Sequence, residues 1–164
     1  MPKAGIQFSK KDEWYTPKEV IDTFGPFEYD PATTKEQAEK SGVSHYDTIE
    51  TDGLKADWTK YHSIWINPPF TKKFDFLYKL MMSLSLPNHI RTACVLLPIE
   101  TLTTKRFHEI VKEPFSLVIP NGRIKFDDGT GGVGSSPTFG SCVLVFGGVQ
   151  GNKILKWKLY GSKA

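Results

Sequence analysis

Short apolar runs alternate with segments of helical periodicity along the first two thirds of the chain. Residues 27–29, 45–50, 64–66 and 93–97 have the length and composition of short strands. Residues 74–84 instead place apolar side chains at spacings of three and four, as one face of a helix does. Strands that alternate with helices are typical of an α/β fold with a largely parallel sheet.

The final third predicts strands only, once a helix over residues 107–111 has ended. Residues 116–119, 141–146 and 154–160 have the composition of strands. Apolar side chains alternate with lysines over residues 155–159, so that one face of this strand is apolar. We therefore expect a mostly parallel sheet with an antiparallel end.

Two segments carry the signals of helix ends. Thr16 is expected to cap the first helix, with Pro17 in its first turn and Glu19 completing a capping box. A second, polar helix is expected over residues 33–40, with Gly42 closing it.

Composition limits the class of protein. The chain has 164 residues, 39% hydrophobic and 24% charged, which suits a single domain over residues 1–164 with its own core. A formal net charge of +3 does not by itself indicate nucleic-acid binding. The N-terminal residues lack the apolar stretch of a signal peptide, and no run of about 18 apolar residues occurs. We therefore expect a soluble, cytoplasmic protein that does not bind a membrane.

The cysteines and histidines do not indicate a metal site. Cys94 and Cys142 lie in apolar runs and form no CxxC motif, which indicates two buried, reduced thiols. The histidines have no ligand spacing, so we expect no bound metal.

Residues 63–70, SIWINPPF, end a buried strand with an amide, a Pro-Pro corner and an aromatic ring. In α/β folds ligands bind beyond the carboxyl ends of strands, which is where Asn67 stands. Proline fixes φ and restricts the residue before it. Pro68 and Pro69 should therefore make a stiff corner that presents the Asn67 side-chain oxygen and the Pro68 carbonyl, with the flat face of Phe70 beside them.

Two neutral acceptors beside an aromatic face suit a planar heterocycle that carries an NH2 group. The acceptors bind both N–H donors while the ring stacks on Phe70, a contact worth about 1–3 kcal/mol for a base. Such an amine is a weak nucleophile because its lone pair is delocalised into the ring. Holding its hydrogens out of the ring plane favours a pyramidal nitrogen whose lone pair points at an electrophile. The same four letters also fit an ordinary turn after a strand.

Six segments in order resemble one known family: DEWYTP, FEYDPAT, DGLKADW, INPPF, LLPIETLTTKRF and GRIKF. INPPF resembles the Asn/Asp-Pro-Pro-aromatic motif of S-adenosylmethionine-dependent methyltransferases that modify exocyclic amines. The chain from about residue 12 to residue 146 is similar to the small phage-type DNA N6-adenine methyltransferases. The resemblance implies a Rossmann-like class I methyltransferase fold, S-adenosylmethionine as cofactor, and a flipped adenine of double-stranded DNA as substrate.

The resemblance also implies roles for individual residues. The catalytic residues are expected to be Asn67, Pro68, Pro69 and Phe70. The residues expected to contact the cofactor come from three segments: Trp14, Tyr15, Thr16 and Pro17; Asp30, Pro31 and Ala32; and Asp52 and Asp57. Of the last two, Asp57 is expected to be better placed because it stands just before the catalytic strand. The alternative for Asp30 is to cap the polar helix that follows it, and for Trp14 to pack in the core.

The chain departs from the family pattern in two places. The glycine-rich cofactor loop of many methyltransferases is replaced by YDPATT, so the cofactor contacts are less well defined than the catalytic ones. Phe70 stands where tyrosine or tryptophan is common, and its ring still provides a stacking face.

A target base inside a duplex must be rotated out of the stack before its amine is accessible. Lys72 and Lys73 follow the corner directly, and Arg123 and Lys125 lie in GRIKF, so these four are expected to bind the DNA backbone. Residues 127–139 are rich in glycine and serine but lack the GK[ST] ending of a nucleotide phosphate loop. We expect a loop that orders on DNA or on the flipped base; a plain connector is the alternative.

Other functions remain open from the sequence. The same corner would serve methylation of another exocyclic amine or amide, on RNA or on a protein glutamine. A catalytically silent DNA-binding module is a third reading, against which the intact Asn-Pro-Pro-Phe argues. So few residues are left for target recognition that we expect a short recognition sequence or loose specificity, and a monomer. For a phage-encoded enzyme the host cytoplasm would be the location, and protection from restriction the natural purpose.

Overall fold

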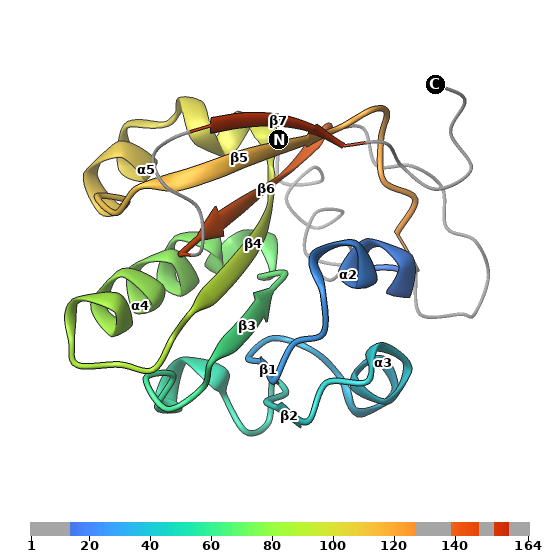
Figure 1. Ribbon diagram of the computed structural model, residues 1–164, viewed down its shortest axis with the longest axis vertical. Coiled ribbons are helices and arrows are strands. Elements are labelled where there is room, and N and C mark those ends of the chain that lie inside the picture. Colours follow the sequence, from blue (N-terminus) through green and yellow to red (C-terminus); the bar gives the residue numbers. More distant parts are fainter. Residues whose placement is uncertain (1–13, 127–138, 148–152, 158–164) are drawn as a thin grey trace, which may run out of the picture.

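A seven-stranded sheet forms the middle of the protein, and helices lie on both of its faces (Figure 1). The computed structural model describes residues 14–126, 139–147 and 153–157. The strands are β1 Tyr29–Asp30, β2 His45–Tyr46, β3 Ser63–Ile66, β4 Thr92–Pro98, β5 Phe115–Pro120, β6 Ser141–Phe146 and β7 Lys153–Trp157. The helices are α2 Lys18–Phe24, α3 Lys35–Ser41, α4 Lys73–Ser85 and α5 Lys105–Ile110, with shorter 3-10 helices η1 Gly53–Lys55, η2 Phe70–Lys72 and η3 Ile99–Thr103.

The strand order is β2-β1-β3-β4-β6-β5-β7. β2, β1, β3 and β4 pair in parallel, β6 runs antiparallel to β4 and β5, and β7 is parallel to β5. The carboxyl ends of the first four strands therefore meet at one edge, where sheets of this type bind ligands. The predicted α/β class with a mostly parallel sheet is confirmed. The expected antiparallel end is also confirmed: the antiparallel strand β6 lies between β4 and β5, in the last part of the strand order.

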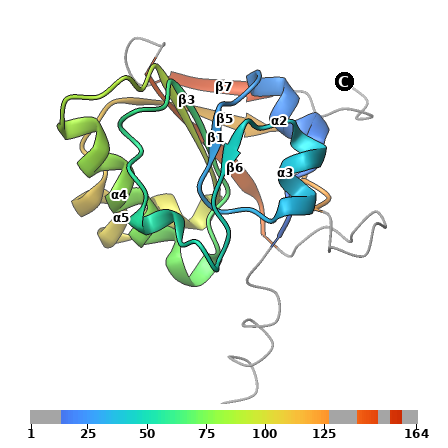
Figure 2. The same cartoon turned by 90° about the horizontal axis from the view of Figure 1, so that it is seen from below.

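Alternation along β3 divides the core between the two faces of the sheet. Ile64 and Ile66 pack in one cluster with Leu77 of α4. Trp65 packs on the opposite face with Val20 of α2. Figure 2 shows the same division, with α4 and α5 on one side of the sheet and α2 and α3 on the other.

Cys94 and Cys142 are buried and form no disulfide. Burial raises the pKa of each thiol to about 12, so both are protonated and unreactive at neutral pH. The prediction of two buried, reduced thiols is confirmed.

The two predicted helix starts have different outcomes. α3 forms where a helix over residues 33–40 was expected but begins at Lys35, with the Thr34 side chain accepting a backbone hydrogen bond at its N-cap. α2 has Pro17 at its N-cap and no side-chain cap. The predicted Thr16 cap is wrong, because the Thr16 hydroxyl accepts a hydrogen bond from Asn67 instead.

The second predicted strand, over residues 45–50, is shorter than expected. It ends at Tyr46, and a turn follows in which the backbone N–H of Thr48 donates to the Thr51 hydroxyl. The backbone N–H of Asp52 then donates to the Thr48 carbonyl. Local hydrogen bonds of this kind compete with strand pairing.

Two predictions concern parts of the chain outside the described ranges. They are the ordering of the loop over residues 127–139, of which only Phe139 is described, and the apolar face of the strand around residues 155–159. Neither is tested.

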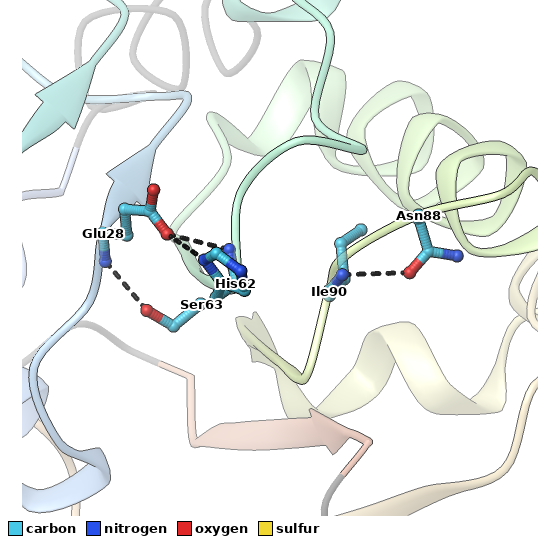
Figure 3. Close-up of polar contacts among 5 residues, drawn as sticks. All are labelled: Glu28, His62, Ser63, Asn88 and Ile90. Carbon is cyan, nitrogen blue, oxygen red and sulfur yellow. Dashed lines mark hydrogen bonds and ion pairs between the residues drawn. The ribbon is translucent and has the colours of Figure 1, made fainter.

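Polar contacts fix the opposite, amino-terminal edge of the sheet (Figure 3). The Glu28 carboxylate accepts a hydrogen bond from the backbone N–H of His62 at 2.8 Å, and the Glu28 N–H donates to the Ser63 hydroxyl at 2.9 Å. The Asn88 side-chain oxygen accepts from the backbone N–H of Ile90 at 3.0 Å. These bonds tie the entry to β3 against β1 and order the turn that leads into β4.

Candidate active site

The loops that follow β1, β2 and β3 enclose a cavity of about 150 Å³ at the carboxyl edge of the sheet. A single water needs about 10–15 Å³ by this measure, so the cavity has room for a ligand of nucleoside size. Its lining residues are Trp14, Tyr15, Pro31, Ala32, Thr33, Thr34, Thr48, Ile49, Asp52, Gly53, Leu54, Asn67, Pro68, Pro69, Lys72 and Phe76. A smaller cavity of about 20 Å³ adjoins it, and its lining includes Thr16, Asp30 and Asn67.

The side-chain amide of Asn67 has a fixed orientation. Its Nδ2 donates to the backbone carbonyl of Trp14 and, at 2.9 Å, to the Thr16 hydroxyl. A carbonyl oxygen only accepts, so the nitrogen of the amide must face Trp14. Asn67 Oδ1 has no hydrogen-bond partner among the described residues and is left as an acceptor beside the cavity.

The Pro-Pro corner is fastened to the helix that follows it. The backbone N–H of Lys72 donates to the Pro69 carbonyl at 3.0 Å. The ammonium of Lys73 donates to the Phe70 carbonyl at 3.1 Å and lies 5.0 Å from the centroid of the Phe74 ring. Lys73 was expected to bind the DNA backbone; its ammonium uses one of its three N–H donors for the Phe70 carbonyl.

Phe70 does not line the cavity; it meets an aromatic ring from a distant part of the chain. Its centroid lies 4.8 Å from that of Phe139, with the rings at 75°. Phe139 is also edge-on to Trp14, at 6.3 Å and 86°. Sequence reasoning included Phe139 only as the last residue of the loop over residues 127–139, because only the fold brings the segment before β6 beside the corner.

Asp30 is a buried carboxyl group at the end of β1. Its Oδ1 accepts a hydrogen bond from the backbone N–H of Ala32 at 3.0 Å. Burial raises the pKa of Asp30 to about 7, against which this hydrogen bond acts only in part. Of the ion pairs between described residues, none involves Asp30. The group is thus suited to receive a cation from a ligand.

The loop after β2 is packed tightly onto the loop after β1. A Cβ at Gly53 would lie only 2.0 Å from the Pro31 carbonyl oxygen, so this close approach requires glycine. Asp52 has a positive φ of 59°, and its side chain accepts a hydrogen bond from the backbone N–H of Leu54 at 3.1 Å. The Trp58 indole donates to the Gly53 carbonyl at 2.8 Å and supports the loop from the core.

Asp52 and Asp57, both expected to contact the cofactor, lie in different surroundings. Asp52 lines the main cavity, whereas Asp57 is exposed and lines neither cavity. The Asp57 carboxylate instead accepts hydrogen bonds from the hydroxyl and the backbone N–H of Thr59, at 2.6 and 3.0 Å. These bonds lower the pKa of Asp57 and serve the local turn. Pro17 also lines neither cavity, because it starts α2.

Sequence reasoning also missed Ile49. Its side chain is 75% exposed, and it lines the cavity from the turn after β2. A large apolar side chain in an otherwise polar turn was the available signal.

The remaining basic residues differ in their position. Lys72 is exposed at the cavity lining, directly after the corner. Arg123 and Lys125 are exposed on either side of the buried Ile124. The Phe126 ring lies 5.9 Å from that of Trp14. The segment over residues 123–126 therefore passes close to Trp14, whose backbone carbonyl binds Asn67 Nδ2.

Within the described ranges, no group of three or more His, Cys, Asp or Glu side chains is arranged to bind a metal ion. The helices described there include none with the length and hydrophobicity needed to cross a membrane.

The chain is similar to known proteins in sequence and in fold. A curated relative, DNA N-6-adenine-methyltransferase of Escherichia phage T1, is 31% identical over 97 residues, which are 57% of this chain and 38% of the relative. The chain thus spans about two fifths of the length of the curated relative.

Two solved structures overlap with most of this chain. A protein assigned as a class I S-adenosylmethionine-dependent methyltransferase from Listeria monocytogenes has 12% identity and a TM-score of 0.42, over 75% of this chain and 44% of that one. A protein assigned as an O-methyltransferase from Agrobacterium tumefaciens has 10% identity and a TM-score of 0.38, over 83% of this chain and 70% of that one.

The family assignment rests on a match that covers most of the chain. The family model of DNA N-6-adenine-methyltransferase (Dam) matches residues 3–154. The resemblance inferred from the six sequence segments is thereby confirmed. The chain belongs to the Dam family of DNA N-6-adenine-methyltransferases.

Proposed function

We propose that this protein transfers a methyl group from S-adenosylmethionine to the N6 amine of an adenine in double-stranded DNA. The observation that carries the proposal is the orientation of Asn67. Its Nδ2 is bound by Trp14 and Thr16, so that its Oδ1 remains to accept a hydrogen bond beside the cavity.

The residues around the cavity fit S-adenosylmethionine, which supplies an electrophilic methyl group on a sulfonium. The buried carboxyl group of Asp30 has no cationic partner among the described residues, and the ligand carries an ammonium group. Ile49 and Leu54 offer apolar surface to an adenine ring, and Asp52 offers a carboxylate to ribose hydroxyls. Trp14, Tyr15, Pro31 and Ala32 complete the proposed cofactor contacts.

The proposed catalytic role of the corner is to bind and orient the amine. Asn67 Oδ1 and the Pro68 carbonyl accept its two N–H bonds, and Phe70 stacks on the base. Out-of-plane acceptors keep the nitrogen pyramidal, so that its lone pair is available for attack. As the N–C bond forms, the bond between the methyl group and the sulfonium sulfur would break, and its electron pair would stay on sulfur as a neutral thioether. The proton on nitrogen then leaves to water, so the reaction needs no strongly basic side chain.

The target adenine has to leave the duplex to reach the corner, which costs a few kcal/mol. We assign Lys72, Arg123 and Lys125 to the DNA backbone, because all three are exposed. Lys73 is better assigned to positioning, since its ammonium binds the Phe70 carbonyl.

The deciding experiment is incubation with S-adenosylmethionine that carries a tritiated methyl group and with DNA of varied sequence, followed by nucleoside analysis. Label in N6-methyl-2′-deoxyadenosine that disappears with Asn67→Ala supports the proposal. In parallel incubations with RNA and with protein, label found in RNA or in protein glutamine, but absent from DNA, refutes the DNA assignment. A catalytically silent module would transfer no label, and it need not show the rise in melting temperature that a bound cofactor produces.

A further inference from the structure

The corner at Asn67 has two sides, and the cavity occupies one of them. The cavity is lined by loops that follow β1, β2 and β3. In the sheet, the other neighbour of β3 is β4. A substrate that meets the proposed cofactor at Asn67 therefore approaches from the side of β4, where η3 and the start of α5 follow the strand.

Arg106 lies on this second side, in the first turn of α5. Its guanidinium carbon lies 4.8 Å from the centroid of the Phe74 ring. Phe74 is in the first turn of α4, directly after the corner, and Lys73 contacts the same ring while it donates to the Phe70 carbonyl. The Phe74 ring thus connects the guanidinium with the catalytic corner. Helices α4 and α5 lie next to each other in both views (Figures 1 and 2).

The charge of Arg106 is exposed and is not neutralised by a carboxylate within the described ranges. Its neighbour Lys105 differs, because the Lys105 ammonium pairs with Glu109 at 3.7 Å. Contact with an aromatic ring limits the rotamers of an arginine while its N–H donors point outwards. A planar guanidinium whose orientation is restricted by a ring suits a phosphate, because it can bind the phosphate through two parallel hydrogen bonds.

We propose that Arg106 binds a phosphate of the DNA strand close to the target adenine. The proposal rests on the proposed function, and it adds a contact on α5 to the basic residues that the sequence suggested. The contact would hold the backbone beside the corner while the base enters it.

The test is the salt dependence of binding to a fluorescently labelled DNA duplex, measured by anisotropy with the full chain and S-adenosylhomocysteine. Loss of one phosphate contact should lower the slope of log K against log [salt] by about 0.9. We expect that decrease for Arg106→Ala, together with an affinity several-fold lower at moderate salt. Arg106→Lys should retain the slope, because it keeps the charge, but bind more weakly, because it loses the fork geometry.

Lys105→Ala is the matched control, since it removes a neighbouring exposed charge that already has a partner. An unchanged slope in Arg106→Ala, or an equal decrease in Lys105→Ala, overturns the proposal. Circular dichroism melting of each variant checks folding; if Arg106→Ala is unfolded, the Arg106→Gln variant replaces it.

Binding and methyl transfer separate this inference from the proposed function. A wild-type protein that binds DNA with an Arg106-dependent slope but methylates no adenine supports the contact and refutes the function. If the wild-type protein methylates adenine but the salt dependence of DNA binding does not change in Arg106→Ala, the proposed function is supported and the Arg106 contact is refuted. Absence of DNA binding in the wild type refutes both.

Discussion

The Thr16 hydroxyl accepts a hydrogen bond from Asn67 Nδ2 at 2.9 Å, across 51 positions of the chain. With the Trp14 carbonyl, it fixes which atom of the amide faces the cavity. An amide that was free to flip would present its nitrogen to the target amine, which needs an acceptor. The segment before α2 therefore orients the proposed catalytic group.

Removing this contact should slow catalysis and leave cofactor binding nearly intact. Thr16→Val keeps the shape but loses an acceptor, a hydrogen bond worth about 0.5–1.5 kcal/mol. We expect the single-turnover rate constant of methylation to fall by about 2- to 12-fold, with little change in the Kd for S-adenosylhomocysteine. Thr23→Val is the control, because that hydroxyl bonds only within α2. An equal loss of rate in both variants would contradict the orienting role.

Removing the acceptor itself should have a larger effect. Asn67→Ala should fold and bind cofactor, because the cavity is formed mainly by other side chains. Loss of a preorganised hydrogen-bonding group typically costs about 100- to 1,000-fold in kcat. Steady-state methylation of DNA measures the loss, and calorimetric binding of S-adenosylhomocysteine checks the site. Turnover at the wild-type rate would refute the assignment.

The face of Phe70 should matter for the flipped base more than for the duplex. Phe70→Ala removes a stacking contact of about 1–3 kcal/mol, so engagement of the target base should weaken by about 5- to 150-fold. Fluorescence of 2-aminopurine at the target position reports the base, and anisotropy reports duplex binding. Tyr78→Ala, an exposed aromatic residue on α4, is the control. Equal losses in the two signals would place Phe70 in general DNA binding instead.

The sequence located the features that depend on neighbouring residues. The corner after β3 has a local signal, since proline geometry and a buried strand are both readable from residues 63–70. Contacts with distant segments had no such signal: nothing in the sequence sets Thr16 or Phe139 beside the corner. Asp57 is a similar case: it stands just before β3 along the chain, but it does not line the cavity, because nearness in sequence is not nearness in space.

Gly53 had no visible role in the sequence, and a test of its packing follows from the structure. Gly53→Ala places a Cβ 2.0 Å from the Pro31 carbonyl oxygen, so the loops after β1 and β2 must separate. We expect a loss of stability of about 1–3 kcal/mol, as for other overpacked sites, and weaker cofactor binding. Gly140→Ala is the control, since its Cβ would meet only Ile99 at 3.7 Å. Chemical denaturation of the two variants makes the comparison, and equal stabilities would contradict the tight contact.

Asp30 should make the stability of the free protein depend on pH. Burial raises its pKa in the folded protein to about 7, whereas an aspartate in the unfolded chain titrates near 4. Below about pH 4 the group is protonated in both states and costs nothing. As the pH rises from about 4 to about 7, only the unfolded chain releases the proton, so the free energy of unfolding falls; above about pH 7 the loss is complete.

Asp30→Asn removes this titration and keeps an oxygen that accepts from the Ala32 N–H. The variant should therefore be more stable than the wild type by roughly 1–4 kcal/mol at pH 8, with the difference disappearing near pH 4. Urea denaturation at several pH values measures it. The same variant should bind S-adenosylhomocysteine more weakly at pH 8, because the ligand's ammonium loses its carboxylate. A gain in stability with a loss of affinity is the pattern of a residue kept for binding, whereas a variant with unchanged affinity would show that the ammonium binds elsewhere.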